Sequence, residues 1–395
     1  DSSLKNIKIA MLLDNDFVSD ARVEKEAVSL IKSGAEVTVY CTRNEKHPDS
    51  ENRVGIQINR VFDESYNAPL RKGYADFIKH HAKNIVREEF AVIHCHDFHM
   101  LSIGAEIKKI APQLILIYDA HEYLKGWPYY QTATSIKSRL KGKIVWNKLL
   151  QKEKKEIKLA DFVVTVSDEI SKRLWKNYNL PSVPLVLNNF PYNFELETVP
   201  NYFHDKFNFE ADQIVLVHSG TIYHTDEQLN ELFKIVTENP LLKLVFIGNR
   251  PRFDEVKEMV SKNPQLLEST VYFHEYLPNQ QANINLISSG DIGLLHVRDL
   301  WEAHKITFSN RFVEYIMAGL PVIGTPQTFT KQFNDKFDCC TFYSEDNTTE
   351  LKDAIDKMIL RYKDLKKNTL EARTSIDWEK ESQKLIRLYQ KVLNG

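Results

Sequence analysis

Residues 309–324 read Ser-Asn-Arg-Phe-Val-Glu-Tyr-Ile-Met-Ala-Gly-Leu-Pro-Val-Ile-Gly, which predicts a short helix followed at once by a strand. Ser309 is a favoured helix N-cap, and apolar residues follow it at helical spacing. Gly319-Leu320-Pro321 predicts a tight turn, because glycine ends helices readily and proline cannot continue them. The apolar run at 321–324 is then a buried strand. A helix joined to a strand in this way is typical of an α/β fold.

The same alternation of apolar runs and amphipathic stretches occurs in both halves of the chain. The predicted strands are 7–13, 37–40, 92–95, 115–119 and 162–167 in the first half, and 214–218, 244–247, 271–273, 292–295 and 321–324 in the second. These runs are apolar throughout, as in parallel strands covered by helices on both faces. We therefore expect an α/β protein with two Rossmann-like, doubly wound domains.

The length and one irregular segment indicate where the domains meet. A chain of 395 residues exceeds what one hydrophobic core usually serves. The segment near 188–200 contains Pro191 and Pro200 and has no clear period. We predict an N-terminal domain over 1–190 and a C-terminal domain over 191–376, facing each other across a cleft. Ligands of such sheets bind beyond the carboxyl ends of the strands, so the loops there are the candidate sites.

The composition is that of an ordinary globular protein. The net charge of −2 gives no reason to expect a nucleic-acid partner. No apolar run is long enough to span a membrane and no signal peptide is evident, so we expect a cytoplasmic protein. The four cysteines show no Cys-x-x-Cys spacing and are expected to be buried thiols in a reducing compartment.

Polar residues follow two strands of the first half. Asp14, Asn15 and Asp16 follow the first strand, where a polar loop is favoured over a divalent metal site. Asp119, His121 and Glu122 end or follow the strand at 115–119, and three titratable groups there favour a binding site. His121 can hydrogen-bond a sugar hydroxyl or titrate near neutrality. The histidine-rich run at 94–99 has no matching ligands elsewhere, so no metal site is expected.

The loops of the second half favour an anion. Ser219-Gly220-Thr221 is a small turn whose backbone N–H groups can approach a phosphate closely. The helix start at Ser309 offers further N–H groups and the helix dipole to a diphosphate. Arg311 adds a planar cationic fork, and Glu314, on the same helix face, can accept both hydroxyls of a ribose. An ordinary Arg–Glu surface pair is the alternative.

Residues 137–158 form a basic stretch with nine Lys or Arg and two Glu. Apolar residues interleave with these charges: Ile144, Val145, Trp146, Leu149 and Leu150. The stretch is either a solvated helix with one core-facing stripe or a docking face for anionic lipid or a phosphorylated acceptor.

Taken together, in their order along the chain and at their spacing, several segments resemble the retaining GT-B glycosyltransferases of family 4, also called group 1. The segments that carry the resemblance are 19–27, 118–122, 166–167, 188–191, 219–221, 247–249, 273–278, 310–322 and 378–393, of which 310–322 is the most specific. The resemblance implies a GT-B fold whose terminal helix, 377–395, crosses back to the first domain.

The resemblance also implies roles for individual residues. His121, Arg311 and Glu314 would act at the transferred sugar, the diphosphate and the ribose. The donor-binding residues would be Ser219, Gly220, Thr221, Gly248, Asn249, Arg250, Tyr276, Leu277, Lys305, Thr307, Ser309, Asn310, Arg311 and Glu314. The acceptor side would comprise Asp14, Asn15, Asp16, Asp119, His121 and Glu122. No cofactor or metal is implied. The co-substrate would be a UDP- or GDP-type nucleotide sugar, and the acceptor a glycan or a lipid-linked molecule.

Two departures from the family pattern leave alternatives open. A second Glu often lies eight residues before the ribose-binding one, and this position is Ile306 here. The usual Arg and Lys pair is absent from 221–226, so Arg311, Lys305 or Arg250 would supply the charge. We expect a metal-independent hexosyltransferase that acts with retention in bacterial surface polysaccharide or glycoconjugate synthesis. The alternatives are a nucleotide-sugar epimerase on the same fold and a non-catalytic nucleotide-sugar-binding protein.

Overall fold

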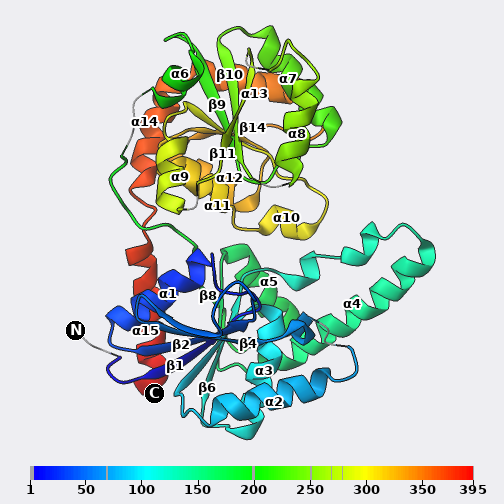
Figure 1. The fold of residues 1–395 in the computed structure, drawn as a ribbon, viewed down its shortest axis with the longest axis vertical. Helices are drawn as coiled ribbons and strands as arrows, with labels where there is room; N and C mark the ends of the chain where they lie inside the picture. Colours follow the sequence, from blue (N-terminus) through cyan, green and yellow to red (C-terminus); the bar gives the residue numbers. More distant parts are fainter. Residues whose placement is uncertain are drawn as a thin grey trace. The chain divides into compact units, whose positions relative to one another are not determined.

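The computed structural model describes residues 4–67, 70–197, 201–249, 251–267, 269–277 and 279–394. The chain divides into two compact units. The first contains Asp1–Asn189 together with Glu379–Gly395, and the second contains Phe190–Trp378 (Figure 1).

The first unit is built on an eight-stranded sheet in the order β3-β4-β2-β1-β5-β6-β7-β8. Its strands are β1 (Lys8–Leu12), β2 (Glu36–Thr42), β3 (Ser50–Arg53), β4 (Ile56–Phe62), β5 (Val92–His96), β6 (Ile115–Ala120), β7 (Phe162–Thr165) and β8 (Leu185–Val186). The strands pair in parallel except β3 and β4, which form an antiparallel hairpin at one edge. Because the other strands run the same way, the loops after β1, β5, β6 and β7 meet at one edge of the sheet.

Helices cover both faces of this sheet. The α-helices are α1 (Ala21–Lys32), α2 (Tyr74–Val86), α3 (Asp97–Ile110), α4 (Ile136–Glu156), α5 (Asp168–Tyr178) and α15 (Trp378–Asn394). Four short 3₁₀ turns complete the unit: η1 (Glu64–Asn67), η2 (Leu124–Gly126), η3 (Tyr129–Thr132) and η4 (Ile157–Leu159). Helices α1 and α15 lie on one face, and α2 and α3 pack together on the other (Figure 1).

Local sequence explains where the helices begin and end. The Asp20 carboxylate caps α1 by accepting a hydrogen bond from the Val23 backbone N–H at 3.0 Å. Gly34 follows α1 with φ of +100°, a conformation that glycine adopts at little cost. Helix α15 belongs to the first unit, where the Glu381 carboxylate accepts a hydrogen bond from the Asn188 backbone at 3.0 Å. The predicted return of the terminal helix to the first domain is therefore confirmed.

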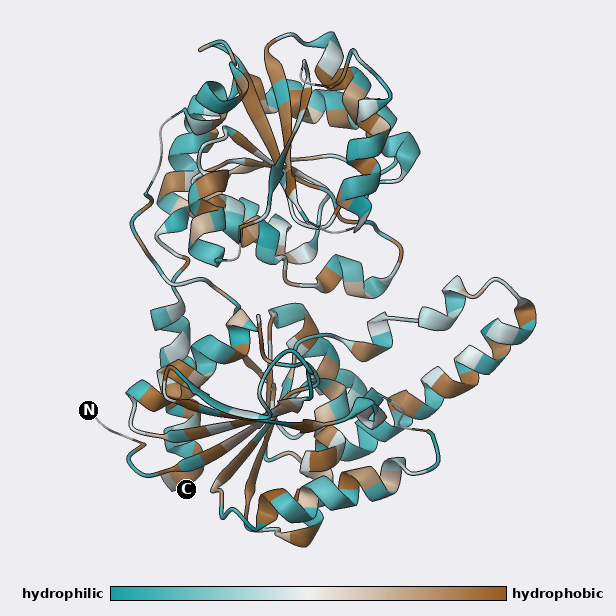
Figure 2. Ribbon diagram, viewed as in Figure 1, coloured by the Kyte–Doolittle hydropathy of each residue, from teal (hydrophilic) through white to brown (hydrophobic). Residues whose placement is uncertain are grey.

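The second unit is built on a six-stranded parallel sheet in the order β11-β10-β9-β12-β13-β14. Its strands are β9 (Ile214–Ser219), β10 (Leu242–Gly248), β11 (Val271–Glu275), β12 (Ile292–Leu295), β13 (Val322–Gly324) and β14 (Cys340–Phe342). Its helices are α6 (Tyr202–Phe207), α7 (Asp226–Glu238), α8 (Pro251–Ser261), α9 (Gln280–Ile287), α10 (Glu302–Ile306), α11 (Asn310–Met317), α12 (Thr328–Phe337), α13 (Thr348–Leu360) and α14 (Tyr362–Arg373). Figure 2 shows hydrophobic strands at the centre of each unit under helices with hydrophilic outer faces.

The predicted α/β class with two Rossmann-like sheets is confirmed, and all ten predicted strands are present. The prediction missed β3, β4, β8 and β14. Strand β4 alternates buried and half-buried residues, unlike the wholly apolar runs that marked the other strands. The four cysteines are buried and free, as predicted. Among the described residues, no helix has both the length and the apolar character needed to cross a membrane.

Candidate active site

The strongest candidate site of the second unit begins at the turn after β9. Gly220 has φ of +82°, and a side chain there would meet the Cδ atom of Arg311 at 3.2 Å. The Ser219 backbone N–H donates to the Tyr315 hydroxyl at 2.8 Å, and that hydroxyl donates to the Leu294 carbonyl at 3.1 Å. Helix α11 thus fixes the position of the turn through a buried tyrosine.

The start of α11 lies against this turn. The Ser309 hydroxyl caps the helix by accepting a hydrogen bond from the Phe312 N–H at 3.3 Å, as predicted. Arg311 donates from Nη1 to the Thr221 carbonyl at 2.8 Å and from Nη2 to the His296 carbonyl at 3.4 Å. Its guanidinium also lies 5.2 Å from the centre of the Tyr223 ring. Arg311 is therefore fixed beside the glycine turn and holds a positive charge there.

Glu314 follows one turn later on α11 and is buried. Its Oε1 atom accepts a hydrogen bond from the Gln280 side-chain amide of α9 at 3.0 Å. The loop before α9 is held by Asn283, whose Oδ1 accepts from the Leu277 N–H at 2.8 Å. The Tyr276 N–H donates to the Gly248 carbonyl at 3.2 Å. The loop after β11 is thus bonded directly to the end of β10. Helix α9 joins the same loop to the Glu314 carboxylate.

The other residues predicted to bind the donor occupy varied positions. Asn249 follows β10 and is exposed, and Asn310 is the exposed first residue of α11. Thr307 ends α10 and is half-buried. Lys305 is 58% exposed and pairs with Asp299 at 3.2 Å. Arg250 lies outside the described residues.

Ile306 occupies the position where the family pattern often has a glutamate, and it is buried at 2% exposure. An apolar side chain packed in this way leaves no carboxylate to contact a donor sugar at this point. The replacement of the family's glutamate by Ile306 is therefore matched by the apolar packing of α10.

Three histidines that the sequence analysis did not select surround Arg311. His218 is the penultimate residue of β9 and is buried, and the His224 and His296 rings stack with centres 3.8 Å apart. His296 Nδ1 lies 2.9 Å from the Tyr343 hydroxyl. Burial, followed by neighbouring histidine and arginine charges, lowers the pKa of His224 well below its ordinary value. Burial likewise lowers the pKa of His296 to about 3, so both rings are neutral at neutral pH.

Several polar atoms in this group have no hydrogen-bond partner. They are both ring nitrogens of His218 and His224, the Nε2 atom of His296 and the hydroxyl of Ser219. Buried polar atoms in folded proteins are normally paired, so such a concentration calls for an explanation such as water or ligand. The signal available in the sequence was a histidine at or directly after two strand ends, His218 and His296.

The first unit has its own charged cluster where β5 and β6 end. Arg22 of α1 grips Asp119 of β6 with two nitrogens, at 2.8 Å from Nη2 and 3.3 Å from Nε. Although burial alone would raise it, Arg22 and His121 hold the pKa of Asp119 well below its usual range. Arg22 also donates to the Leu187 carbonyl at 2.9 Å. This pair joins α1 to the sheet and places a carboxylate behind His121.

His121 lies between two carboxylates. Its Nδ1 atom is 3.0 Å from Asp97, and its Nε2 atom is 3.3 Å from Asp119. Although burial alone would lower it, these carboxylates hold the pKa of His121 well above its ordinary value. The imidazole is therefore a cation at neutral pH and a hydrogen-bond donor. Titration near neutrality, one of its two predicted roles, does not fit this geometry.

The other acceptor-side residues divide into two groups. Burial and the Asp97 carboxylate raise the pKa of Asp14 to about 6. Surrounding protein and the same carboxylate raise the pKa of Glu122, which is open to solvent on one side, to about 7. Asn15 and Asp16 instead hold their own loop, because the Phe17 and Val18 N–H groups donate to their side chains at 2.8 and 3.2 Å. Asp14 and Glu122 are thus the residues of this group best placed to meet a ligand together with His121.

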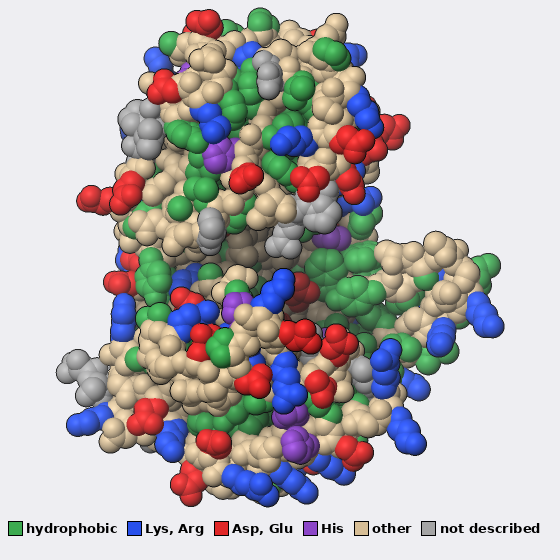
Figure 3. All heavy atoms as spheres, viewed as in Figure 1, with side chains coloured by type: hydrophobic (Ala, Val, Ile, Leu, Met, Phe, Trp, Pro, Cys, Tyr) green, Lys and Arg blue, Asp and Glu red, His purple; other side chains and the backbone are tan. Residues whose placement is uncertain are grey.

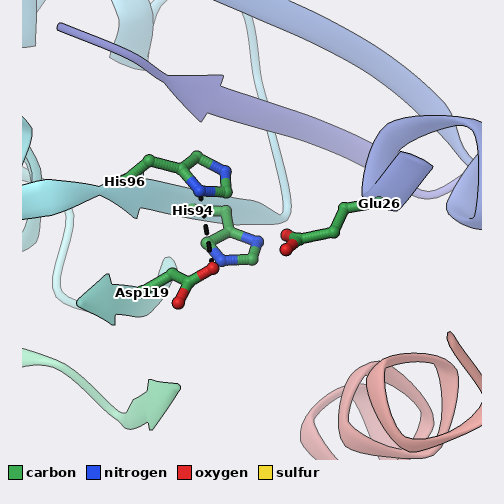
Figure 4. Close-up of side chains that lie close together, drawn as sticks. All are labelled: Glu26, His94, His96 and Asp119. Carbon is green, nitrogen blue, oxygen red and sulfur yellow. Dashed lines mark ion pairs between the residues drawn. The ribbon is translucent and has the colours of Figure 1, made fainter. Parts of the chain in front are cut away.

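Glu26, His94, His96 and Asp119 place one ligand atom each within 4.8 Å of one another, which is a candidate metal-ligand set (Figure 4). The Arg22 guanidinium lies 3.1 Å from Glu26 and 2.8 Å from Asp119. A divalent ion would have to share both carboxylates with this fixed cation. The cluster is better explained as a charge-balanced support for His121.

Comparison with known proteins identifies both halves of the chain. Residues 22–188 match a family model described as Glycosyltransferase Family 4. Residues 213–361 match a model described as Glycosyl transferases group 1. Both halves are therefore glycosyltransferase domains. No curated protein sequence matches the chain.

Solved structures with the same fold align with nearly the full length of this chain. A sucrose-phosphate synthase from Thermosynechococcus elongatus is similar, with 15% identity, a TM-score of 0.71, and 98% of this chain and 100% of that chain covered. The Anabaena HepE protein in complex with UDP has 14% identity and a TM-score of 0.70, with 98% and 100% covered. A glycosyltransferase from Rickettsia africae has 13% identity and a TM-score of 0.69, with 98% and 99% covered. At these identities the likeness shows the fold, which is GT-B.

Proposed function

We propose that this chain, a glycosyltransferase of the GT-B fold, transfers a hexose from a UDP- or GDP-type nucleotide sugar to an acceptor hydroxyl with retention. The observation that carries the proposal is the gathering of the Ser309-capped helix start, Arg311 and the Gly220 turn at one edge of the second sheet. The dipole of a helix start and a fixed guanidinium suit a diphosphate. Glu314, one turn along, suits the ribose hydroxyls.

A uridine base is the first choice for the donor. Among proteins of the same fold, HepE is known in complex with UDP and with UDP-glucose, and a trehalose-6-phosphate protein from E. coli is bound with UDP-2-fluoro glucose. In this chain, the loop from Glu275 to Leu277 would hold the base. Asn283 fixes that loop by accepting from the Leu277 N–H at 2.8 Å.

The reaction would break the bond between the anomeric carbon and the diphosphate oxygen and form a bond to the acceptor oxygen on the same face of the sugar. The departing diphosphate would take the acceptor proton, so no separate carboxylate base is required. Arg311 and the start of α11 would stabilise the negative charge that grows on the leaving group. The His121 cation, held by Asp97 and Asp119, would place a positive charge beside the transferred sugar.

The acceptor would be a glycan or a lipid-linked molecule used in bacterial surface polysaccharide or glycoconjugate synthesis, at the cytoplasmic side of the membrane. Asp14 and Glu122, beside His121, would offer their carboxyl groups to acceptor hydroxyls. The raised pKa values of these two carboxyls let them donate as well as accept hydrogen bonds near neutral pH.

A thermal-shift panel of UDP, GDP, ADP and dTDP sugars tests the proposal first, because a ligand of the native state raises its stability. The stabilising donor is then incubated with glycan and lipid-linked acceptors, and the release of nucleoside diphosphate is followed. Incubation of the donor alone, followed by sugar analysis, separates transfer from epimerisation. Binding without release of nucleoside diphosphate with any acceptor would mark a non-catalytic binder and overturn the proposal.

A further inference from the structure

Helix α4 forms an arm whose C-terminal end is anchored to β6 and α3 of the first unit. There, Glu153 is buried and accepts hydrogen bonds from Tyr118 at 2.9 Å and from Tyr178. The Ser102 hydroxyl donates to Glu156 at 2.8 Å. The N-terminal half of the helix instead extends away from the sheet (Figure 1).

The projecting half of α4 is braced on one side by the turn η3. A Cβ atom on Gly142 would come within 2.7 Å of Tyr130, so glycine permits a close approach there. Trp146, one turn further along, packs on the Tyr130 ring with centres 5.4 Å apart. The Arg139 Nε atom donates to the Ala133 carbonyl at 2.8 Å. One side of the projecting half of α4 therefore packs on η3. The opposite side of this helix is exposed to solvent.

The uncovered side carries an apolar stripe. Ile136, Leu140 and Ile144 follow each other at intervals of four and are 78%, 62% and 59% exposed. Residues four apart lie on one face of a helix, and at 100° per residue this face is opposite Gly142 and Trp146. Large apolar side chains this exposed on one face mark an interaction surface.

Cationic residues flank the stripe. Residues 136–152 contain six Lys or Arg and no Asp or Glu. Helical geometry places Lys137, Lys141 and Lys148 along one side of the stripe. Figure 3 shows Lys and Arg side chains beside hydrophobic ones on this projecting helix. An exposed apolar stripe bordered by cations is the pattern of a helix that lies in a membrane interface.

We infer that the α4 arm, residues 129–152, docks this protein onto an anionic lipid surface. The stripe would enter the boundary between headgroups and acyl chains, and the flanking cations would meet lipid phosphates. A second copy of the chain is a poorer partner, because a two-fold contact through α4 would set the same cations against each other. The inference does not depend on the proposed reaction, since it uses no residue of the candidate active site.

Co-sedimentation with vesicles tests the inference on the full chain. The protein should pellet with vesicles of phosphatidylcholine and phosphatidylglycerol, and not with phosphatidylcholine alone. Added salt should weaken this partition, because exposed charges are screened. The triple variant Lys137→Glu/Lys141→Glu/Lys148→Glu and the variant Leu140→Ser/Ile144→Ser should each partition at least about tenfold less.

A matched control changes three exposed lysines elsewhere: Lys234→Glu/Lys257→Glu/Lys352→Glu. It alters the net charge by the same amount and should keep vesicle binding close to that of the wild type. Circular dichroism shows whether each variant is folded. Failure of the wild type to bind anionic vesicles at low salt, or equal loss in the control, would overturn the inference. The inference would also be overturned if sedimentation velocity showed a wild-type dimer and the Leu140→Ser/Ile144→Ser variant were monomeric but still bound vesicles.

Discussion

Arg311 donates a hydrogen bond from Nη1 to the backbone carbonyl of Thr221 at 2.8 Å, and so ties the start of α11 to the turn after β9. The same residue packs its Cδ atom against Gly220, where only a glycine fits without strain. One side chain thus both shapes the turn and brings a positive charge to it. Arg311 therefore has a structural role in the turn in addition to any role in binding a phosphate.

Arg311→Ala should therefore lower kcat/KM for sugar transfer by about 100-fold or more, the scale found when one preorganised charge-stabilising donor is removed. Arg311→Lys should recover part of this loss, because it restores the charge without the fork that holds Thr221. Arg361→Ala removes an exposed arginine that pairs with Asp338, and it should leave the rate unchanged. Unchanged turnover in Arg311→Ala would contradict the proposed role.

His121 should remain protonated through neutral pH, because Asp97 and Asp119 hold its pKa well above the ordinary value. The pairing stabilises the fold fully below the unfolded-state pKa, and this contribution is lost only as pH rises through the raised one. Asp97→Asn keeps the shape and tolerates the positive φ of 61°, yet removes one charge. In this variant, kcat/KM should begin to fall at a lower pH than in the wild type.

Proton NMR of the His121 ring measures the same quantity directly. A wild-type ring that titrates near its ordinary value of 6.5 would contradict the assignment of His121 as a fixed cation. A pH profile of Asp97→Asn identical to that of the wild type would do so as well.

Glu153 should make the first unit lose stability as pH rises. Burial raises its pKa from 4.5 to about 7, despite hydrogen bonds from Tyr178 and Tyr118 that act the other way. The folded state therefore favours the protonated acid. The stabilisation is complete below pH 4.5 and is lost as pH rises through 7, by on the order of 3 kcal/mol. Denaturant unfolding of Glu153→Gln should show a flatter pH dependence in this window.

Glu45→Gln, at an exposed position, is the control and should keep the wild-type slope. Parallel slopes for Glu153→Gln and the wild type would mean that Glu153 does not anchor α4 as a buried neutral acid.

Transfer should persist after chelation of divalent metal ions. In the proposed mechanism, Arg311 and the start of α11 offset the charge of the diphosphate. Turnover is measured after dialysis against EDTA, with and without added Mg²⁺ or Mn²⁺. Activity that disappears on chelation and returns with either ion would show that the charge is offset differently.

The sequence was most informative where neighbours along the chain determine the structure. The cap at Ser309, the glycine turn at 319 and the proline after it specify α11 and β13 locally, so these elements could be predicted. Strands β3 and β4 were missed because their hairpin turns at Val54 and Gly55, both with positive φ, and valine is not a residue that signals such a turn.

The support of the candidate site could not be predicted, because it depends on contacts between distant residues. Arg22 and Asp119 are separated by 97 positions, and their pairing follows only from the packing of α1 on the sheet. Arg22 lay within the segment 19–27 that carried the family resemblance, yet nothing local marked it as a partner. His224 and His296 stack across two loops, so their burial and neutral charge become evident only in the folded unit.

Titration calorimetry of UDP, or of the diphosphate that the thermal-shift panel selects, tests most directly whether α11 binds a ribonucleoside diphosphate. Glu314→Ala should weaken binding by about 10- to 100-fold, the range for hydrogen bonds to a charged group. The 2′-deoxy nucleotide should bind the wild type more weakly, and Glu314→Ala should weaken it by less than the ribonucleotide. Equal losses for both nucleotides, or no loss at all, would contradict the assignment of Glu314 to the ribose.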